Sequence, residues 1–237
     1  MVILIDDAGY NDFGFMGSKE MQTPNIDALT SEGVVFTDAH VAATVSSPSR
    51  ACLITGRYGH RFGYECNLSD RTNGLPLEEE TIAEVFKTNG YRTAAIGKWH
   101  LGSRDEQHPN NRGFDLFYGM KAGGRDYFYN EKKSDRPGDE RNLLLNDRQV
   151  KFEKYLTDAF SEKAVEFINE SSQPFMMYLA YNAVHTPMQA TDEDMAKFEG
   201  HPRQKLAAMT YALDRGVGTV IRGLKDSGKF DNTLIFS

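Results

Sequence analysis

Apolar and polar residues follow one another along the chain in an order typical of strand, loop, helix and strand. Residues 1–5 form an unbroken apolar run, as expected for a strand buried in a parallel sheet. The same patterns predict further strands at 34–36, 91–96, 175–181 and 234–236, and helices after Thr23, at 79–89, after Thr157 and at 205–227. This alternation predicts an α/β fold with a mostly parallel central sheet flanked by helices.

Residues 102–150 break this pattern, because they are polar, rich in Gly, Asn, Asp and Arg, and show little periodicity. We interpret them as long functional loops laid over one face of the domain. Arg125 and Asp126, which precede a run of aromatic residues, suit an exposed loop that contacts a sugar, and His108 is a further candidate for substrate contact. The alternative is that these side chains only pack the loops down.

Titratable residues occur where predicted strands end. Asp6 and Asp7 come directly after the first strand, Lys98 and His100 follow the 91–96 strand, and His185 follows the 175–181 strand. Ligands of open α/β sheets bind outside the carboxyl ends of the strands. We therefore expect these side chains to meet at one edge of the sheet.

The adjacent carboxylates of Asp6 and Asp7 repel each other unless a cation lies nearby. Carboxylate oxygens favour Ca²⁺ or Mg²⁺ over zinc. The pair is thus a candidate metal site, although an exposed turn or a helix cap would also explain it.

The stretch from Ser46 to Arg57 is the most informative part of the sequence. Ser47 is suited to cap a helix, Pro48 to begin it and Gly56 to end it, which places Ser46 at a helix N-terminus, where anions bind. Arg50 lies about one turn further on, where its guanidinium can orient a nucleophile or hold an oxyanion. An ordinary capped helix with a surface arginine is the alternative interpretation.

The pattern Ser-x-Pro-Ser-Arg-x-x-x-x-Thr-Gly-Arg that starts at Ser46 resembles the signature of the formylglycine-dependent sulfatases, in the serine form of the bacterial branch. The resemblance continues through other segments, namely 5–10, 23–29, 33–37, 97–102, 112–119, 182–187 and 231–235. It implies an alkaline-phosphatase-like sulfatase core, with residues 1–237 forming the N-terminal catalytic domain and a C-terminal subdomain absent. On this resemblance, both ends of the chain are expected to be cut, and the family's remaining metal ligands are expected beyond Ser237.

The resemblance also implies roles for individual residues. Ser46 would be oxidised to formylglycine by a maturation enzyme, and would bind a divalent metal, Ca²⁺ in preference to Mg²⁺, together with Asp6 and Asp7. Lys98 and Arg50 would hold the sulfate. His185 would donate a proton to the leaving alcohol and His100 would accept one, or the two histidines would exchange these roles; Lys98 and His185 would also contact the substrate.

Composition limits the possible partners. The formal net charge is −7, which argues against nucleic-acid binding, and no apolar run approaches the length of a membrane span. Cys52 and Cys66 do not form a disulfide framework, and Cys52 is expected to be a buried thiol. The resemblance favours a sulfated carbohydrate, or another small sulfate ester, as substrate and a periplasmic or secreted location.

Two other functions fit part of the pattern. A phosphomonoesterase or phosphodiesterase of the alkaline phosphatase superfamily would use an unmodified nucleophile and two zinc ions, although zinc pairs need further His and Asp ligands. The second alternative is an inactive sulfatase-like domain that binds sulfated glycans. The presence of Arg50, Lys98, His100 and His185 argues against that loss of activity.

Overall fold

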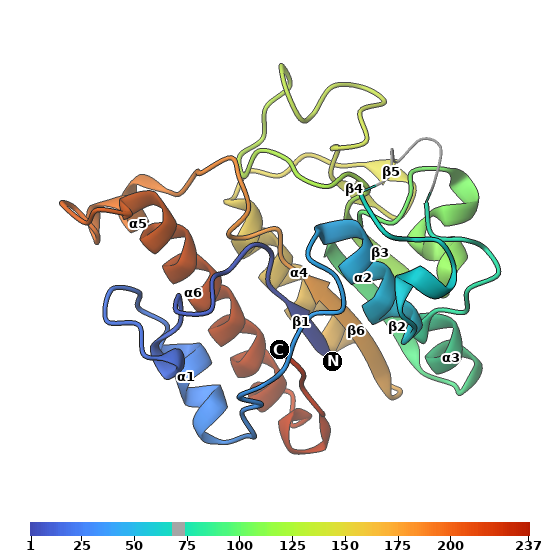
Figure 1. Cartoon of the computed structure of the whole chain (residues 1–237), viewed down its shortest axis with the longest axis horizontal. Coiled ribbons are helices and arrows are strands. Elements are labelled where there is room, and N and C mark those ends of the chain that lie inside the picture. The colour runs from blue at the N-terminus through green and yellow to red at the C-terminus, as the bar shows by residue number, and fades with distance from the viewer. Residues whose placement is uncertain (68–73) are drawn as a thin grey trace.

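The structure is a computed structural model that describes residues 1–67 and 74–237 (Figure 1). Its strands are β1 (Val2–Leu4), β2 (Arg92–Lys98), β3 (Leu116–Met120), β4 (Leu144–Leu145), β5 (Arg148–Gln149) and β6 (Phe175–Ala180). Its α-helices are α1 (Pro24–Ser31), α2 (Ser46–Thr55), α3 (Ile82–Thr88), α4 (Leu156–Glu170), α5 (Asp192–Ala196) and α6 (Gln204–Asp226).

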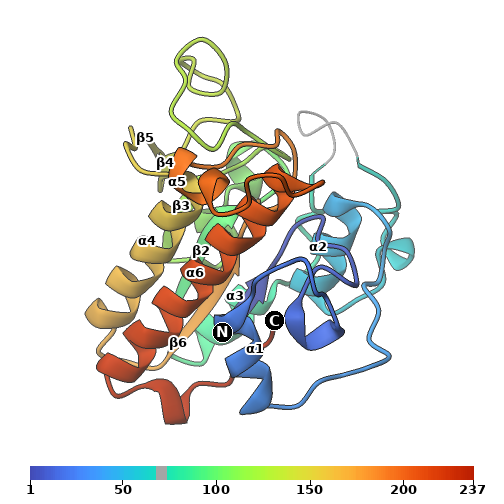
Figure 2. The same ribbon diagram turned by 90° about the vertical axis from the view of Figure 1, so that its left-hand side faces the viewer.

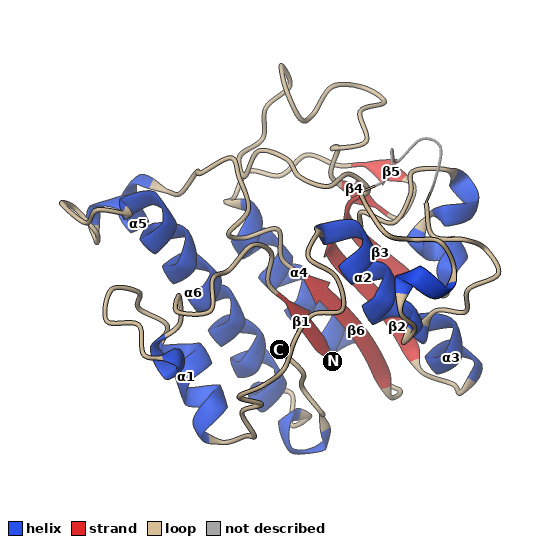
Figure 3. Ribbon diagram, viewed as in Figure 1, coloured by secondary structure: helices blue, strands red, loops and turns tan. Residues whose placement is uncertain are grey.

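The strands form one mixed sheet in the order β1-β6-β2-β3-β4-β5 (Figure 3). The first four strands in this order pair in parallel, and β4 and β5 extend the sheet as a short antiparallel edge. Helices α4 and α6 pack against each other on one side, as Figure 2 shows. The expected α/β fold with a mostly parallel sheet is confirmed.

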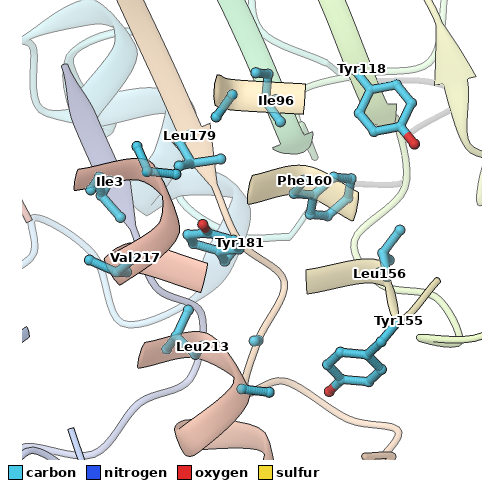
Figure 4. Close-up of a cluster of buried hydrophobic side chains, with 14 of the residues drawn as sticks. Ile3, Ile96, Tyr118, Tyr155, Leu156, Phe160, Leu179, Tyr181, Leu213 and Val217 are labelled. Atoms are coloured by element: carbon cyan, nitrogen blue, oxygen red, sulfur yellow. The ribbon is translucent and has the colours of Figure 1, made fainter. Parts of the chain in front are cut away.

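Two hydrophobic cores form because successive side chains of a strand point to opposite faces of the sheet. Along β6, Met177 and Leu179 belong to the core built with α4 and α6, which Figure 4 shows. Met176 and Tyr178 belong to the core built with α2 and α3 on the other face. Each fully buried side chain of this size contributes about 2 kcal/mol of transfer free energy. The chain is thus a three-layer arrangement whose central strands are covered on both faces.

Helix α1 is capped by a residue from another helix. Thr23 occupies the N-cap position, as expected, but its hydroxyl makes no capping bond; it accepts from the Gly14 amide and donates to Asp27. The Asp214 carboxylate of α6 instead accepts from the backbone amides of Asn25 and Ile26, at 3.1 and 2.8 Å. Free amides at a helix N-terminus require such acceptors, so Asp214 joins α1 to α6.

Three other expectations about local structure are wrong in detail. Residues 34–36 form no strand and are exposed, because strand propensity has no effect without a pairing partner. The helix expected at 79–89 begins only at Ile82, behind a capping box of Thr81 and Glu84. Thr157 and Ser47, expected as caps, lie inside the first turns of α4 and α2.

The largest departure concerns residues 102–150, which are not only loops. They contain β3, a buried strand that pairs with β2 over its whole length. A Cβ on Gly119 of this strand would lie 1.9 Å from the carbonyl oxygen of Gly97, so only glycine fits. Such glycines allow two backbones to approach closely, but in a sequence they are typical of loops, so this strand was predicted as part of a loop.

Two further sequence expectations concern the cysteines and the length of the helices. Cys52 is buried and Cys66 exposed, and both are free thiols, as expected for Cys52. In the part of the chain that the structure describes, no helix combines the length and the apolar character that crossing a membrane requires.

Candidate active site

The candidate site lies at the carboxyl ends of the three neighbouring strands β1, β6 and β2. Asp6 follows β1, Lys98 is the last residue of β2, and His185 follows β6. His100 comes two residues after Lys98, and the N-terminus of α2 brings Ser46 to the same place. The expectation that separate strands deliver these groups to one edge matches the geometry.

Asp6 is the electrostatic centre of the site. Its carboxylate accepts from Arg50 Nη2 at 3.0 Å and from Lys98 Nζ at 2.6 Å, and the residue is 6% exposed. Burial alone would raise the pKa of Asp6, but the charges of Arg50 and Lys98 outweigh it and hold the pKa below its usual value. Two cations against this one buried carboxylate give the buried part of the site an excess of positive charge, which suits an anionic substrate, while the carboxylate of Asp7 is exposed.

Arg50 is locked in place by four contacts. Besides Asp6, it donates from Nη1 to the Lys98 carbonyl at 3.0 Å and to the Tyr178 hydroxyl at 3.2 Å, and from Nε to Ser46 Oγ at 3.1 Å. The residue is 2% exposed, so the alternative of a surface arginine is wrong. A planar guanidinium with fixed donors is suited to hold oxyanion oxygens in one orientation.

Ser46 is the residue on which the site converges. It is the first residue of α2, after the N-cap Val45, rather than the residue just before the helix. Its Oγ lies 3.1 Å from Arg50 Nε and 3.1 Å from His100 Nδ1. The position keeps Ser46 at the positive end of the helix dipole, beside a cation and an imidazole.

His100 is an imidazole held in the neutral form. Its pKa is lowered to about 3, chiefly by burial and then by the positive charges of Lys98 and Arg50. Its backbone adopts a left-handed conformation with φ of 57°, and its carbonyl accepts from the Ser47 hydroxyl at 2.7 Å. A neutral ring facing Ser46 is suited to accept a proton.

His185 faces the site from the opposite side, next to Asp7. Its Nδ1 lies 2.6 Å from the Thr186 carbonyl, so this nitrogen carries a proton, and its Nε2 lies 3.7 Å from Asp7 Oδ2. The side chain of His185 is 29% exposed and that of Asp7 60%. This half of the site is open to solvent, and so to a substrate.

The donors for a metal are of the right type but few in number. Asp6 and Asp7 offer hard carboxylate oxygens, which suit Ca²⁺ or Mg²⁺, and Arg50 bonds both Asp6 and the oxygen of Ser46. Both oxygens of Asp6 already accept from cations, and residues 1–67 and 74–237 contain no cluster of three or more His, Cys, Asp or Glu side chains placed to hold an ion. Calcium takes about six to eight oxygens, so these residues alone do not complete its shell.

The three loop residues expected at the substrate lie elsewhere. His108 is buried, with Nε2 3.1 Å from the Asn146 carbonyl and its ring edge-on to Phe117. Arg125 is 2% and Asp126 6% exposed, and both are bound within the protein. The expectation of an exposed sugar-binding loop at Arg125 and Asp126 is wrong, because Arg125 pairs with the buried Asp135 and Asp126 accepts from Ser134 and Gln189.

Sequence reasoning missed Tyr178 and Ser47. Tyr178 lies in the middle of β6, where it looked like one more core residue, yet its hydroxyl accepts from Arg50. Ser47 was expected to cap α2, but its hydroxyl bonds Tyr64 and the His100 carbonyl. A tyrosine in a buried strand needs a polar partner, and that was the one available signal.

Known proteins resemble this chain in sequence and in structure. A family model described as Sulfatase matches residues 1–237. Arylsulfatase G of Mus musculus is 36% identical over 267 residues, which cover 100% of this chain and 50% of that protein. The uncharacterized sulfatase YdeN of Escherichia coli strain K12 is 35% identical over 248 residues, covering 92% of this chain and 42% of that protein.

A solved structure is also similar. Ps i-CgsB in complex with k-i-k-neocarrahexaose superposes with a TM-score of 0.92 at 45% identity, covering 99% of this chain and 56% of that chain. The chain thus spans about half the length of these relatives.

Proposed function

This chain belongs to the sulfatase family, and we propose that it contributes the catalytic site of an enzyme that hydrolyses sulfate esters of a carbohydrate. One observation carries the proposal: Ser46 Oγ lies 3.1 Å from both Arg50 Nε and His100 Nδ1, with Lys98 beside the same carboxylate as Arg50. A nucleophile, an acceptor for its proton and two cations for an anion therefore meet in one place.

We propose further that Ser46 acts after oxidation to formylglycine by a maturation enzyme. The aldehyde, once hydrated, supplies one hydroxyl group to attack the sulfur of the ester and a second to release the sulfate. Plain serine has only one hydroxyl, so turnover would stop after the first step. The location of Ser46 in the first turn of α2 supports this role, since the residue is half-buried there and its hydroxyl lies within reach of Arg50 and His100.

The other residues bind and orient the ester and move its protons. Arg50 and Lys98 hold the sulfate oxygens and stabilise the charge that develops on them. His185, when it carries a proton on both ring nitrogens, donates the Nε2 proton on the solvent side to the departing alcohol and keeps the Nδ1 proton on the Thr186 carbonyl. His100, neutral because of its lowered pKa, accepts the proton from the hydroxyl at position 46.

For the metal we propose Ca²⁺, held by Asp6, Asp7 and the oxygen at position 46 together with ligands outside the described residues. A bound cation there would withdraw charge from the sulfate oxygens. The hard oxygen donors support Ca²⁺, and Mg²⁺ is the less favoured alternative.

A sulfated oligosaccharide is the substrate class we propose. The relative that is 45% identical, Ps i-CgsB, was solved in complex with k-i-k-neocarrahexaose, an oligosaccharide. The opening beside His185 and Asp7 supports access of a bulky alcohol from that side. A periplasmic or secreted location follows from the family resemblance, and we propose it on that basis.

The discriminating experiment compares an aryl sulfate with the matching aryl phosphate. The matured protein should release the phenol from the sulfate at least about a hundredfold faster than from the phosphate, and Ser46→Ala should abolish both reactions. A protein that prefers the phosphate would instead be a phosphatase of the same superfamily. Binding of sulfated glycans with no sulfate release would identify an inactive domain.

A further inference from the structure

We propose that the segment of residues 121–127 sets the position of both catalytic histidines, with Gly123 and Gly124 as positioning residues. The inference rests on the proposed function, because it assigns roles to His100 and His185 in that reaction. It comes from a part of the chain whose expected role, an exposed sugar-binding loop, is not what the structure shows.

The two ends of this segment bond the backbones of the two histidines. The Lys121 carbonyl accepts from the His100 amide at 3.0 Å. The Tyr127 hydroxyl lies 2.8 Å from the His185 carbonyl and 2.6 Å from the Asn182 carbonyl. Tyr127 is fully buried, so water does not compete for these bonds. One short segment therefore connects residues that follow two different strands.

The middle of the segment lies against the two imidazole rings. A Cβ on Gly123 would lie 2.6 Å from Cε1 of His100, and a Cβ on Gly124 would lie 3.2 Å from Cε1 of His185. Neither glycine has a positive φ, so the backbone at these positions would accept alanine. Close contact with the histidine rings, rather than backbone conformation, therefore explains why both positions are glycine.

Arg125 fixes the segment to the body of the protein. Its guanidinium donates to both oxygens of Asp135, at 2.7 and 2.9 Å, and to the Arg141 carbonyl at 2.8 Å. It also lies over the Phe152 ring, 4.7 Å from the centroid. Since both side chains of the Arg125–Asp135 pair are fully buried, the two glycines directly before Arg125 have little freedom to yield. Displacement by an added methyl group should therefore fall on the histidine rings.

The three atoms nearest to an added Cβ on Gly123 belong to His100, and those nearest on Gly124 belong to His185 and Thr186, rather than to the cations that hold sulfate. Alteration of either glycine should consequently lower kcat much more than it raises KM. A displacement of about 1 Å in a catalytic group can reduce turnover about a hundredfold. We expect Gly123→Ala to approach that loss and Gly124→Ala, with its looser contact, to lower kcat by about tenfold.

The experiment is a double-mutant cycle on the matured protein with an aryl sulfate. Gly123→Ala should reduce kcat strongly in the wild-type background and by less than about threefold in a His100→Ala background, because it acts through that ring. Gly33→Ala is the matched control, since Gly33 is exposed, its added Cβ meets only ordinary contact, and it is far from the site in sequence. Equal losses in both backgrounds, or a kcat within about twofold of wild type for Gly123→Ala, would overturn the proposal.

A second measurement does not depend on turnover. In the proton–carbon NMR spectrum of the unmatured protein at one pH, the Cε1–H signals of the histidines report directly on the contacted atoms. Gly123→Ala should move the His100 signal, Gly124→Ala the His185 signal, and Gly33→Ala neither. Unmoved signals would refute the positioning role. Signals that shift as expected in the variants, together with a matured wild-type protein that hydrolyses no sulfate, would refute only the proposed function.

Discussion

Replacement of Arg50 by lysine tests how the site is held together. The guanidinium makes four contacts: with Asp6, the Lys98 carbonyl, the Tyr178 hydroxyl and Ser46 Oγ. Lysine keeps the positive charge, but a single ammonium group cannot reach acceptors that lie around a planar fork.

The expected cost follows from the contacts that are lost. If the ammonium retains two of the four contacts, the other two hydrogen bonds from a charged donor are lost, at about 1.5 kcal/mol each, which gives about 3 kcal/mol in the free energy of unfolding. The loss of a fixed donor to the developing negative charge should also lower kcat about a hundredfold to a thousandfold.

Urea denaturation measures the first effect, because Trp99 is the one tryptophan of the chain and is 1% exposed. Hydrolysis of an aryl sulfate by the matured variant measures the second. Arg222→Lys is the matched control, since Arg222 is exposed and its guanidinium donates to the Thr219 hydroxyl of the same helix. If the free energy of unfolding of Arg50→Lys lies within about 0.5 kcal/mol of that of wild type and the variant retains full turnover, the fixed geometry of the guanidinium donors has no importance and our reasoning fails.

Three further predictions concern separate parts of the molecule. The pKa of His100 is about 3 in the folded state and about 6.5 in the unfolded state, so between these pH values the unfolded state binds one more proton. The free energy of unfolding of the metal-free protein should therefore fall as the pH decreases from 6.5 to 3, by up to about 1.4 kcal/mol per pH unit. In urea titrations, His100→Asn should flatten this slope. Asp7→Asn should weaken Ca²⁺ binding, seen by calorimetry, about tenfold or more, while the melting temperature without metal stays near that of wild type because Asp7 is exposed; unchanged Ca²⁺ affinity would remove Asp7 from the metal site. Asp214→Ala should cost about 2–3 kcal/mol in urea denaturation, because the amides of Asn25 and Ile26 lose their buried acceptor, and a cost below about 0.5 kcal/mol would show that water replaces it.

The sequence predicted the site better than it predicted the loops around it. Asp6, Lys98 and His185 were found because polar residues at the ends of apolar runs stand out, and parallel strands bring such ends to one edge. A proline and a glycine mark the limits of the helix that holds Ser46 and Arg50, and the resemblance of the surrounding pattern to the sulfatase signature singled out the two residues. These signals are local in sequence, so they can be read without coordinates.

The features that were missed depend on contacts between distant residues. Strand β3 was hidden by Gly119, whose small size is required by the Gly97 backbone of the neighbouring strand. Thr23 does not cap α1 through its side chain because Asp214, far away in sequence, supplies the acceptors. Arg125 was predicted to be exposed because the residues next to it in the sequence do not indicate that Asp135 is its buried partner across the loop. Tertiary partners of this kind override local propensity.

The most direct test of the central claim relates turnover to the chemical state of Ser46. Preparations in which different fractions of Ser46 have lost two hydrogens, measured by mass spectrometry of the peptide that contains it, are assayed for sulfate release. The account predicts a rate proportional to the converted fraction, extrapolating to zero when none is converted. Sustained turnover by protein with wholly unconverted Ser46 would contradict it.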